Sequence, residues 1–337
     1  MPPTVAQVYL TTRCGLACEW CPAIPLRRCY GGRGVDAKWD PTKRNIEEIA
    51  DMGIPRVKLD GGDVLLMPWL PRPLELCNEL GLHCSITLSG QMLRQRLSEW
   101  GDEWLGLPDV LGLSVEGNPQ RHDKRRAKGC HPALVATLKA SARVRRGKPT
   151  LLVFTLVPGI DGNIDEVQIE SVLELAREHG AIIMANFLFG PFHTGRKDEC
   201  RAMWTSLAGQ ELEVLDWLKG QPEVLPFDDK LAFIRGGGNN IENTSCHASE
   251  AVLVISPEGK VVRHCFISPH ASVKIEEGGI RAAVKVLDEL YREEHAQRSG
   301  TITNYCQGCM ALCHIGVGWA HKRGLVGPEL TDELMRF

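Results

Sequence analysis

The sequence predicts an α/β fold with a parallel sheet, because short apolar stretches alternate along the chain with stretches of helical periodicity. Six of the apolar stretches have the length of buried strands, and helices of about a dozen residues separate them. Strand–helix–strand repeats of this kind form parallel sheets with right-handed crossovers. The composition, 43% hydrophobic and 24% charged over 337 residues, is that of a globular protein with a sizeable core.

Glycine, proline and capping residues mark the ends of these elements. Asp40 as N-cap and Pro41 at the first helical position predict a helix that runs to Met52 and ends at Gly53. The other helices of the series are expected at 69–80, 91–100, 132–145 and 164–179, and the strands at 8–10, 56–59, 83–88, 110–115, 151–157 and 181–188. Polar stretches that follow these strands should meet at one edge of the sheet, where chemistry collects in such folds.

The alternation changes after about residue 200. A helix is expected at 207–219, and three glycines at 236–238 are typical of a linker. Beyond the linker a β-hairpin (251–255 and 260–263) and two helices (280–294 and 312–322) are expected. We therefore divide the chain into residues 1–200, a connecting segment 201–245 and a small domain 246–337.

Composition excludes several classes of partner. The net charge of -3 gives no broad electrostatic case for nucleic acid. No apolar stretch reaches the eighteen or so residues that a membrane-spanning helix needs, and residues 1–7 lack the features of a signal peptide. We expect a cytoplasmic protein that partners neither nucleic acid nor a membrane.

The 13 cysteines are unusual as disulfides in a reducing compartment, so a metal role is the better interpretation of the clustered ones. Cys77, Cys84 and Cys130 instead lie singly in apolar or helical surroundings. We expect these to be buried thiols without a chemical role.

The strongest motif is the stretch from Thr11 to Cys21, which follows the first strand. Its Cys-x3-Cys-x2-Cys spacing brings Cys14, Cys18 and Cys21 onto one loop. Three thiolates this close can hold three irons of a four-iron cluster and leave the fourth iron open. The alternative is a structural zinc loop with Cys29 as the fourth thiolate, although zinc loops more often use pairs of cysteines in two separated knuckles.

This spacing resembles the cluster loop of the radical S-adenosylmethionine (SAM) superfamily. The resemblance implies a partial (β/α)6 barrel and an open iron that is chelated by the amino and carboxylate groups of SAM. It also implies the reaction: an electron from the cluster cleaves SAM, and the resulting 5′-deoxyadenosyl radical abstracts hydrogen from a substrate.

The resemblance extends to the ends of later strands. Gly61-Gly62-Asp63 stands where the family usually has Gly-Gly-Glu, and the stretch from Ser114 to Arg125 is similar to a Ser-x-Asp-Gly…His-Asp-x-x-Arg pattern of the SPASM/twitch branch. In that stretch Glu116 replaces the usual aspartate. The residues that the resemblance implies for SAM binding are Gly61, Gly62, Asp63, Ser89, Ser114, Glu116, Arg125 and Asn186.

A second group of cysteines lies in the last part of the chain: Cys246, Cys265, Cys306 and Cys309. Four thiolates can saturate a [4Fe–4S] cluster, and a hairpin followed by a helix and Cys-x2-Cys resembles the twitch domain with its auxiliary cluster. An all-cysteine zinc site is the alternative. Cys313 is surplus, and either Cys309 or Cys313 could be the fourth ligand.

These observations predict a radical SAM enzyme whose auxiliary cluster supports a redox modification: dehydrogenation, epimerisation or bond formation. We expect a small-molecule substrate such as a sugar or aminoglycoside, with a peptide as the alternative, since no additional N-terminal leader-binding domain is evident. An epimerase would need a thiol hydrogen donor, with Cys313 and Cys200 as candidates. The electron donor would be a protein such as flavodoxin or ferredoxin. The alternative from another class is a zinc-stabilised binding module without catalysis.

Overall fold

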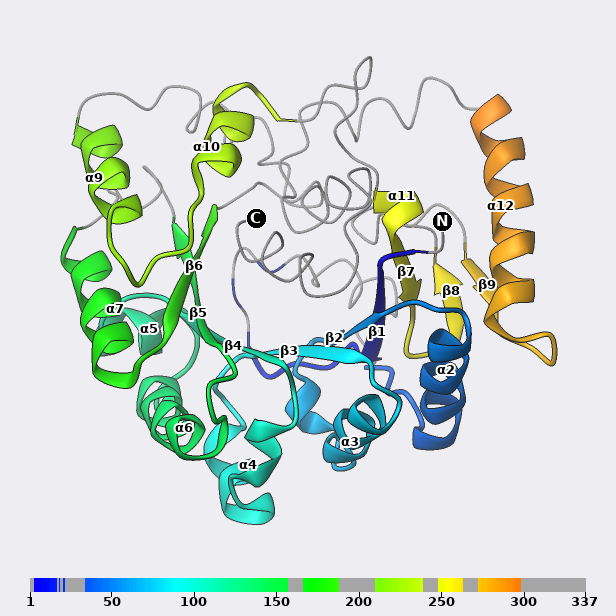
Figure 1. Ribbon diagram of the computed structural model, residues 1–337, viewed down its shortest axis with the longest axis horizontal. Coiled ribbons are helices and arrows are strands. Elements are labelled where there is room, and N and C mark those ends of the chain that lie inside the picture. Colours follow the sequence, from blue (N-terminus) through cyan, green and yellow to red (C-terminus); the bar gives the residue numbers. More distant parts are fainter. Residues whose placement is uncertain are drawn as a thin grey trace.

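The protein is seen in a computed structural model that describes residues 3–16, 18, 21, 34–156, 166–187, 210–238, 248–262 and 272–297. Within these residues nine strands form one curved sheet, in the order β6-β5-β4-β3-β2-β1-β7-β8-β9 (Figure 1). The first six strands in the sequence are parallel to one another, as the alternation of strands and helices predicts. The α/β class and the six-stranded parallel series of a partial (β/α)6 barrel are thereby confirmed.

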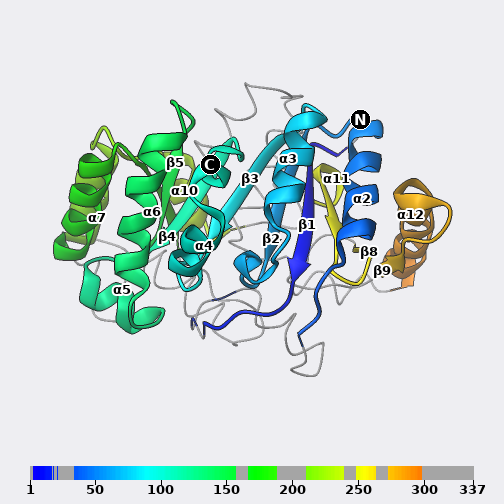
Figure 2. The same ribbon diagram turned by 90° about the horizontal axis from the view of Figure 1, so that it is seen from below.

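The parallel strands are β1 (Val5–Thr11), β2 (Arg56–Gly61), β3 (His83–Leu88), β4 (Val110–Val115), β5 (Thr150–Leu156) and β6 (Ile182–Phe187). The helices that alternate with them are α2 (Trp39–Asp51), α3 (Pro71–Glu79), α4 (Leu93–Trp100), α6 (Cys130–Val144) and α7 (Glu166–His179). These helices cover the convex side of the sheet (Figures 1 and 2).

The two faces of the sheet differ in chemistry. On β4, Leu111, Leu113 and Val115 are fully buried in the core that the helices share, whereas Ser114 is only half-buried. The same alternation on other strands leaves polar side chains on the concave face. There Asp60 accepts a hydrogen bond of 2.6 Å from Gln7 and pairs with the Lys58 ammonium at 3.0 Å. The helices therefore bury the apolar side, and the polar side faces the inside of the curve.

The C-terminal hairpin continues this sheet. β7 (Val252–Ile255) pairs in parallel with β1, and β8 (Lys260–Val262) and β9 (Ser272–Lys274) follow in antiparallel order. α12 (Gly279–Gln297) packs against β8 and β9. Its first N–H groups, those of Ile280 and Arg281, donate to the carboxylate of Glu48 on α2 at 2.8 and 3.0 Å. The hairpin was predicted, whereas its pairing with the first strand was not.

The opposite edge of the sheet is covered by a short extended segment. Ile183 of β6 exchanges backbone hydrogen bonds of 2.7 and 2.9 Å with Glu223 and Leu225. This segment lies between α9 (Gln210–Lys219), which was predicted, and α10 (Asp228–Arg235), which was not. The sheet edge at β6 is thus paired and not left open.

Other elements differ in detail from the prediction. The helix α2 begins at Trp39, so Asp40 lies in its first turn and is not the N-cap. There the negative charge of Asp40 interacts favourably with the helix dipole. A short helix that the sequence analysis missed, α5 (Pro119–Arg125), follows β4. The remaining short elements are the 3-10 turns η1 (Val64–Leu66) and η2 (Glu103–Gly106) and the helix α11 (Ala248–Ala251). The helix expected at 312–322 lies outside the described residues.

No helix in the described part of the chain combines the length and the apolar character needed to cross a bilayer.

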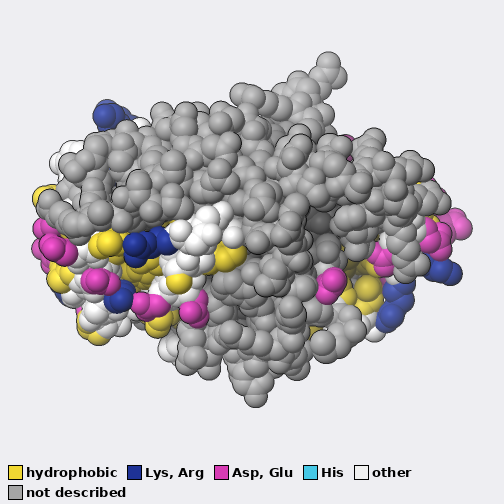
Figure 3. Space-filling model, turned by 90° about the horizontal axis from the view of Figure 1, so that it is seen from above, with side chains coloured by type: hydrophobic (Ala, Val, Ile, Leu, Met, Phe, Trp, Pro, Cys, Tyr) yellow, Lys and Arg dark blue, Asp and Glu magenta, His cyan; other side chains and the backbone are white. Residues whose placement is uncertain are grey.

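Large apolar side chains are exposed at both flanks, on α7 and α9 (Val167 and Trp217) and on α12 (Val286 and Leu290). Hydrophobic side chains are visible at both flanks in the view from above (Figure 3).

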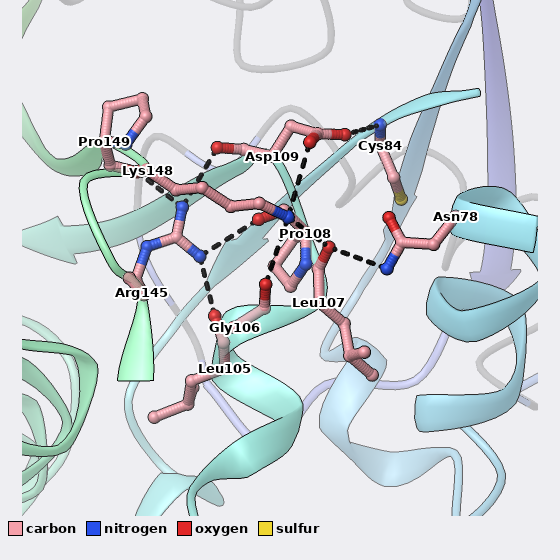
Figure 4. Close-up of polar contacts among 10 residues, drawn as sticks. All are labelled: Asn78, Cys84, Leu105, Gly106, Leu107, Pro108, Asp109, Arg145, Lys148 and Pro149. Atoms are coloured by element: carbon pink, nitrogen blue, oxygen red, sulfur yellow. Dashed lines mark hydrogen bonds and ion pairs between the residues drawn. The ribbon is translucent and has the colours of Figure 1, made fainter. Parts of the chain in front are cut away.

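A buried arginine holds together the amino ends of the strands (Figure 4). Arg145, 3% exposed, donates to the carbonyl oxygens of Leu105 and Pro149 at 2.6 Å, Asp109 at 3.0 Å and Pro108 at 3.1 Å. Burial lowers the pKa of Arg145 to about 10, so the guanidinium stays protonated at neutral pH. One side chain therefore links the turns that precede β4 and β5.

We expect Arg145→Met to lower the free energy of unfolding by about 3 kcal/mol or more, because it leaves buried carbonyls without a donor. Arg143 is the matched control: its side chain is 64% exposed and its ion pair with Asp102 is at the surface, so Arg143→Met should cost less than about 1 kcal/mol. Chemical unfolding followed by circular dichroism measures both. Equal effects of the two substitutions would contradict the role assigned to Arg145.

Candidate active site

The three cysteines of the predicted cluster loop lie directly after β1. Cys18 is buried, while Cys14 and Cys21 are partly exposed, and none of the three forms a disulfide. The backbone curls around them: the Leu16 N–H lies 3.4 Å from the Cys14 sulfur, and the Cys21 N–H donates to the Cys18 carbonyl at 3.2 Å. One short loop thus carries three thiols outside any disulfide, the set of donors that three irons of a cubane require.

The start of this loop is fixed by a network around Asp36. The Asp36 carboxylate accepts a hydrogen bond from the Thr11 hydroxyl at 2.6 Å and pairs with the Arg13 guanidinium at 2.5 Å. The backbones of Thr12 and Val35 also meet, with a hydrogen bond of 2.9 Å. Arg13, the residue before Cys14, is therefore held in place by Asp36, which lies more than twenty residues further along the chain.

The glycine turn after β2 packs directly on the cysteine loop. The Gly62 N–H donates to the Thr11 carbonyl at 2.8 Å, and the Asp63 N–H donates to the Arg13 carbonyl at 2.7 Å. A side chain at Gly62 would place a Cβ 2.1 Å from the Arg13 oxygen and 3.0 Å from the Cβ of Cys14. Glycine is required here because two backbones touch, a reason that applies whether or not SAM is bound.

Asp63 is buried, 2% exposed, beneath this turn. One carboxylate oxygen accepts the Leu65 N–H at 3.1 Å, and the Leu65 carbonyl accepts a 2.7 Å hydrogen bond from Arg96. Burial raises the pKa of Asp63, opposed by the Leu65 N–H and by the Ser89 hydroxyl. Ser89 faces the carboxylate without a well-aligned hydrogen bond, and both the Asp63 Oδ2 and the Ser89 Oγ are buried without one.

A buried ion pair lies next to Asp63. Glu116, fully buried just after β4, accepts hydrogen bonds from Arg126 at 2.6 and 3.0 Å through its Oε1. The Glu116 Oε2 has no hydrogen-bond partner in the described part of the chain. Burial raises the pKa of Glu116, and Arg126 opposes that rise. Burial also raises the pKa of the Cys18 thiol to about 11, again opposed by Arg126. One arginine therefore acts on both the carboxylate and the cysteine loop.

This arginine is a candidate site residue that the sequence analysis did not select. Counting the His-Asp-x-x-Arg pattern from His122 places its arginine at 126, one residue beyond the Arg125 that we selected. Arg126 is almost fully buried in its pair with Glu116, and its Nη1 also points to the Ser89 carbonyl at 3.5 Å. Arg125 is partly exposed at the end of α5.

His122 and Asp123 of the same pattern have different surroundings. The His122 ring is fully buried, neither nitrogen has a hydrogen bond to a described residue, and it stands edge-on to His131 at 5.6 Å. Burial, with Arg126 nearby, lowers the pKa of His122 to about 3, so the ring is neutral. Asp123 accepts the N–H groups of Gly129 and His131 at 2.7 Å each and so caps the start of α6.

Ser114 and Asn186 are half-buried, on β4 and β6 respectively, and are separated in the sheet by β5. Their positions in the alternation place them on the concave face. The other predicted site residues lie outside the described part of the chain: Cys29, Cys200, Cys246, Cys265, Cys306, Cys309 and Cys313.

The types of residue gathered here suit a four-iron cluster and SAM, although no three His, Cys, Asp or Glu side chains among the described residues are placed as ligands of a single metal ion. The loop supplies three thiols that form no disulfide. Beside it lie three buried oxygens without well-formed hydrogen bonds, those of Asp63, Ser89 and Glu116. Buried polar atoms of this kind are rare in folded proteins unless a ligand or water completes them. These oxygens can accept hydrogen bonds from a charged amino group, and the nearby Arg126 guanidinium can bind a carboxylate. Both groups are present in the amino-acid part of SAM.

No family model matches the chain. Among curated proteins, the AdoMet-dependent heme synthase of Methanosarcina barkeri is 29% identical over 58% of this chain and 53% of its own length. The PqqA peptide cyclase of Bradyrhizobium diazoefficiens is 26% identical over 36% of this chain and 34% of its own. The chain thus spans about half, or less, of the length of these relatives.

Solved structures share the fold. Streptococcus suis SuiB bound to the precursor peptide SuiA matches 79% of this chain and 60% of its own, with a TM-score of 0.60 and 15% identity. The anSMEcpe structure with bound AdoMet matches 78% of this chain and 75% of its own, with a TM-score of 0.51 and 12% identity. With a Cys-x3-Cys-x2-Cys loop directly after the first strand and an AdoMet-dependent relative matched over 58% of this chain, the chain is similar to the radical SAM enzymes.

Proposed function

We propose that this radical SAM enzyme modifies a peptide, using SAM bound between the cysteine loop and the ends of β2, β3 and β4. The observation that carries the SAM site is the convergence of Cys14, Cys18 and Cys21 with the buried, incompletely bonded oxygens of Asp63 and Glu116. These groups come from three different strand ends, those of β1, β2 and β4, and gather beside the cysteine loop.

Each residue has a definite part in this proposal. Cys14, Cys18 and Cys21 hold a [4Fe–4S] cluster, which when reduced supplies the electron that cleaves SAM. Asp63 accepts hydrogen bonds from the SAM amino group. Arg126 attracts its carboxylate.

The second oxygen of Glu116 remains free to accept a hydroxyl hydrogen bond, while its first oxygen keeps Arg126 in place. The hydroxyl of Ser89 lies beside the carboxylate of Asp63 and can turn toward either that group or a ligand. Ser114 and Asn186, which lie on the concave face, are assigned to the side of the site that the substrate approaches. Such a site works mainly by positioning, since the apolar outer face excludes water from the other side of the sheet.

Comparison with relatives favours a peptide over the sugar or aminoglycoside that the sequence analysis put first. Curated relatives include PqqA peptide cyclases, and the SuiB structure of the same fold is bound to a precursor peptide. The polar concave face also suits a peptide, which presents a hydrogen-bonding backbone. A tetrapyrrole, suggested by the heme synthase relative, is the second candidate. We place the enzyme in the SPASM/twitch branch on the strength of the peptide cyclases and its cysteine pattern.

The C-terminal cysteines complete the proposal. Cys246, Cys265, Cys306 and either Cys309 or Cys313 would hold an auxiliary [4Fe–4S] cluster that takes an electron from the substrate radical. This suits a net oxidation such as the formation of a crosslink in a peptide. A flavodoxin or ferredoxin would reduce the first cluster. Cys313 and Cys200 remain candidate thiols near the substrate.

Iron content tests the two clusters separately. In protein purified without oxygen, Cys18→Ala should remove about four irons per chain and abolish 5′-deoxyadenosine formation. Cys306→Ala should also remove about four irons but leave SAM cleavage in place. Cys77→Ala, a buried thiol on α3, should change neither quantity. Retained SAM cleavage in Cys18→Ala would contradict the assignment of the first cluster.

Arg126 and Arg125 provide a matched pair for SAM binding. We expect Arg126→Gln to weaken SAM binding about tenfold or more, because a charged hydrogen bond to the ligand is lost. Arg125→Gln should have a much smaller effect. The double variant Arg126→Gln with Glu116→Gln guards against misfolding caused by an unpaired buried carboxylate. Equilibrium dialysis with labelled SAM measures all three, and equal losses at positions 125 and 126 would count against the proposed site.

The class of substrate can be tested with a low-molecular-mass extract of the source organism. We expect this fraction to stimulate 5′-deoxyadenosine formation above the rate with SAM and reductant alone. Digestion of the fraction with a broad protease should remove the stimulation if the substrate is a peptide. Stimulation that survives digestion would refute the peptide and favour a small molecule or tetrapyrrole.

A further inference from the structure

Cys130, the first residue of α6, is a buried thiol that the proposed function does not use. It is 2% exposed and belongs to a small apolar cluster with Leu16 and Cys18, against which Cys14 and Cys21 also pack. The sequence places it more than one hundred residues from that loop and gives no sign of this contact. A fourth thiol thus adjoins the three proposed iron ligands.

The surroundings of Cys130 are those of the proposed SAM site. Asp63 and Arg126 are both close enough to affect the Cys130 thiol electrostatically, and Arg126 in turn is affected by Cys18 and Cys130. Gly90, which follows Ser89, packs against Cys130: a Cβ at Gly90 would be in van der Waals contact with the Cys130 Cβ and carbonyl at 3.6 Å. Cys130 therefore contacts the cysteine loop and is also near the groups assigned to the polar end of SAM.

The position of this thiol is fixed. Asp123 binds the N–H groups on both sides of Cys130, and the Cys130 N–H itself donates to the Ala127 carbonyl at 3.1 Å. The helix that begins here packs on α4 and α5.

We propose that Cys130 is a reversible fourth thiolate ligand of the cluster when SAM is absent. The inference rests on the proposed function, because it requires a cluster at Cys14, Cys18 and Cys21. As the iron–sulfur bond to Cys130 forms, the thiol proton passes to solvent. When SAM arrives, this bond breaks, the SAM amino nitrogen and a carboxylate oxygen take its place, and Cys130 regains a proton. No electron is transferred in either direction.

Two consequences follow from this exchange. Cys130 protects the fourth iron when SAM is absent, so oxidants should release this iron from the cluster more slowly than they release an iron exposed to solvent. SAM must also displace Cys130 in order to bind, so the thiol lowers the apparent affinity for SAM. A residue that served only to pack the loop would produce neither effect.

The test compares wild type, Cys130→Ala and Cys77→Ala, all carrying clusters assembled without oxygen. Each is treated with ferricyanide, with and without SAM, and released iron and the electron paramagnetic resonance signal of the three-iron cluster are followed. Without SAM, Cys130→Ala should lose iron about tenfold faster than wild type, the scale on which groups around a metal change its retention. With SAM present the two rates should converge, and Cys77→Ala should match wild type throughout.

Binding of SAM supplies the second readout: Cys130→Ala should bind SAM several-fold more tightly than wild type. Equal rates of iron loss without SAM would overturn the proposal, as would faster loss that persists unchanged with SAM, because that result indicates packing alone. Failure of the proposed function is distinguishable, since wild type and Cys18→Ala would then contain the same amount of iron.

Discussion

The site depends on one contact between two backbones. The turn at Gly61 and Gly62 lies against the cysteine loop so closely that a methyl group at Gly62 would overlap the Arg13 carbonyl. Hydrogen bonds from Gly62 and Asp63 to that loop fix its height above the sheet. Because β1 and β2 are parallel neighbours, both turns emerge at the same edge. The thiols of the loop and the carboxylate of Asp63 are consequently placed by the sheet itself, and the other site residues are arranged around them.

The local pattern of apolar and polar residues was sufficient to predict the six parallel strands. His83–Leu88 and Val110–Val115 have the predicted bounds, because buried apolar residues recur at alternate positions in each stretch. The short polar helix α5 has no such run and was missed, although Pro119 and the cap formed by Asn118 on the Arg121 N–H were signals for it. The position of the cluster cysteines at the end of β1 was also predictable, since their spacing and the preceding strand are both local features.

Contacts between distant residues were not predictable from the sequence in this way. The pairing of β7 with β1 and the cap that Glu48 provides for α12 join segments more than two hundred residues apart. Nothing in either segment alone specifies its partner. The contact of Cys130 with the cysteine loop was likewise not predictable. In the sequence Cys130 is an isolated thiol among apolar and helical residues, and only the folded chain places it against Leu16 and Cys18. Arg126 differs, because its spacing from His122 was visible and the correct count would have identified it.

The two ends of the sheet use buried polar groups in opposite ways. At the amino ends, the Arg145 guanidinium reaches four carbonyl oxygens, so its burial is offset by hydrogen bonds and the turns are locked. At the carboxyl ends, Asp63 and Glu116 each bury an oxygen without a well-formed hydrogen bond, and His122 buries two ring nitrogens in the same state. Burial without hydrogen bonds costs free energy that folding alone does not return. Incomplete bonding alone does not mark this end of the sheet, because the Arg145 Nε and the Trp104 Nε1 are also buried without a hydrogen bond to a described residue. What distinguishes the carboxyl ends is that several such groups gather there beside the cysteine loop, where the proposed ligand would complete them.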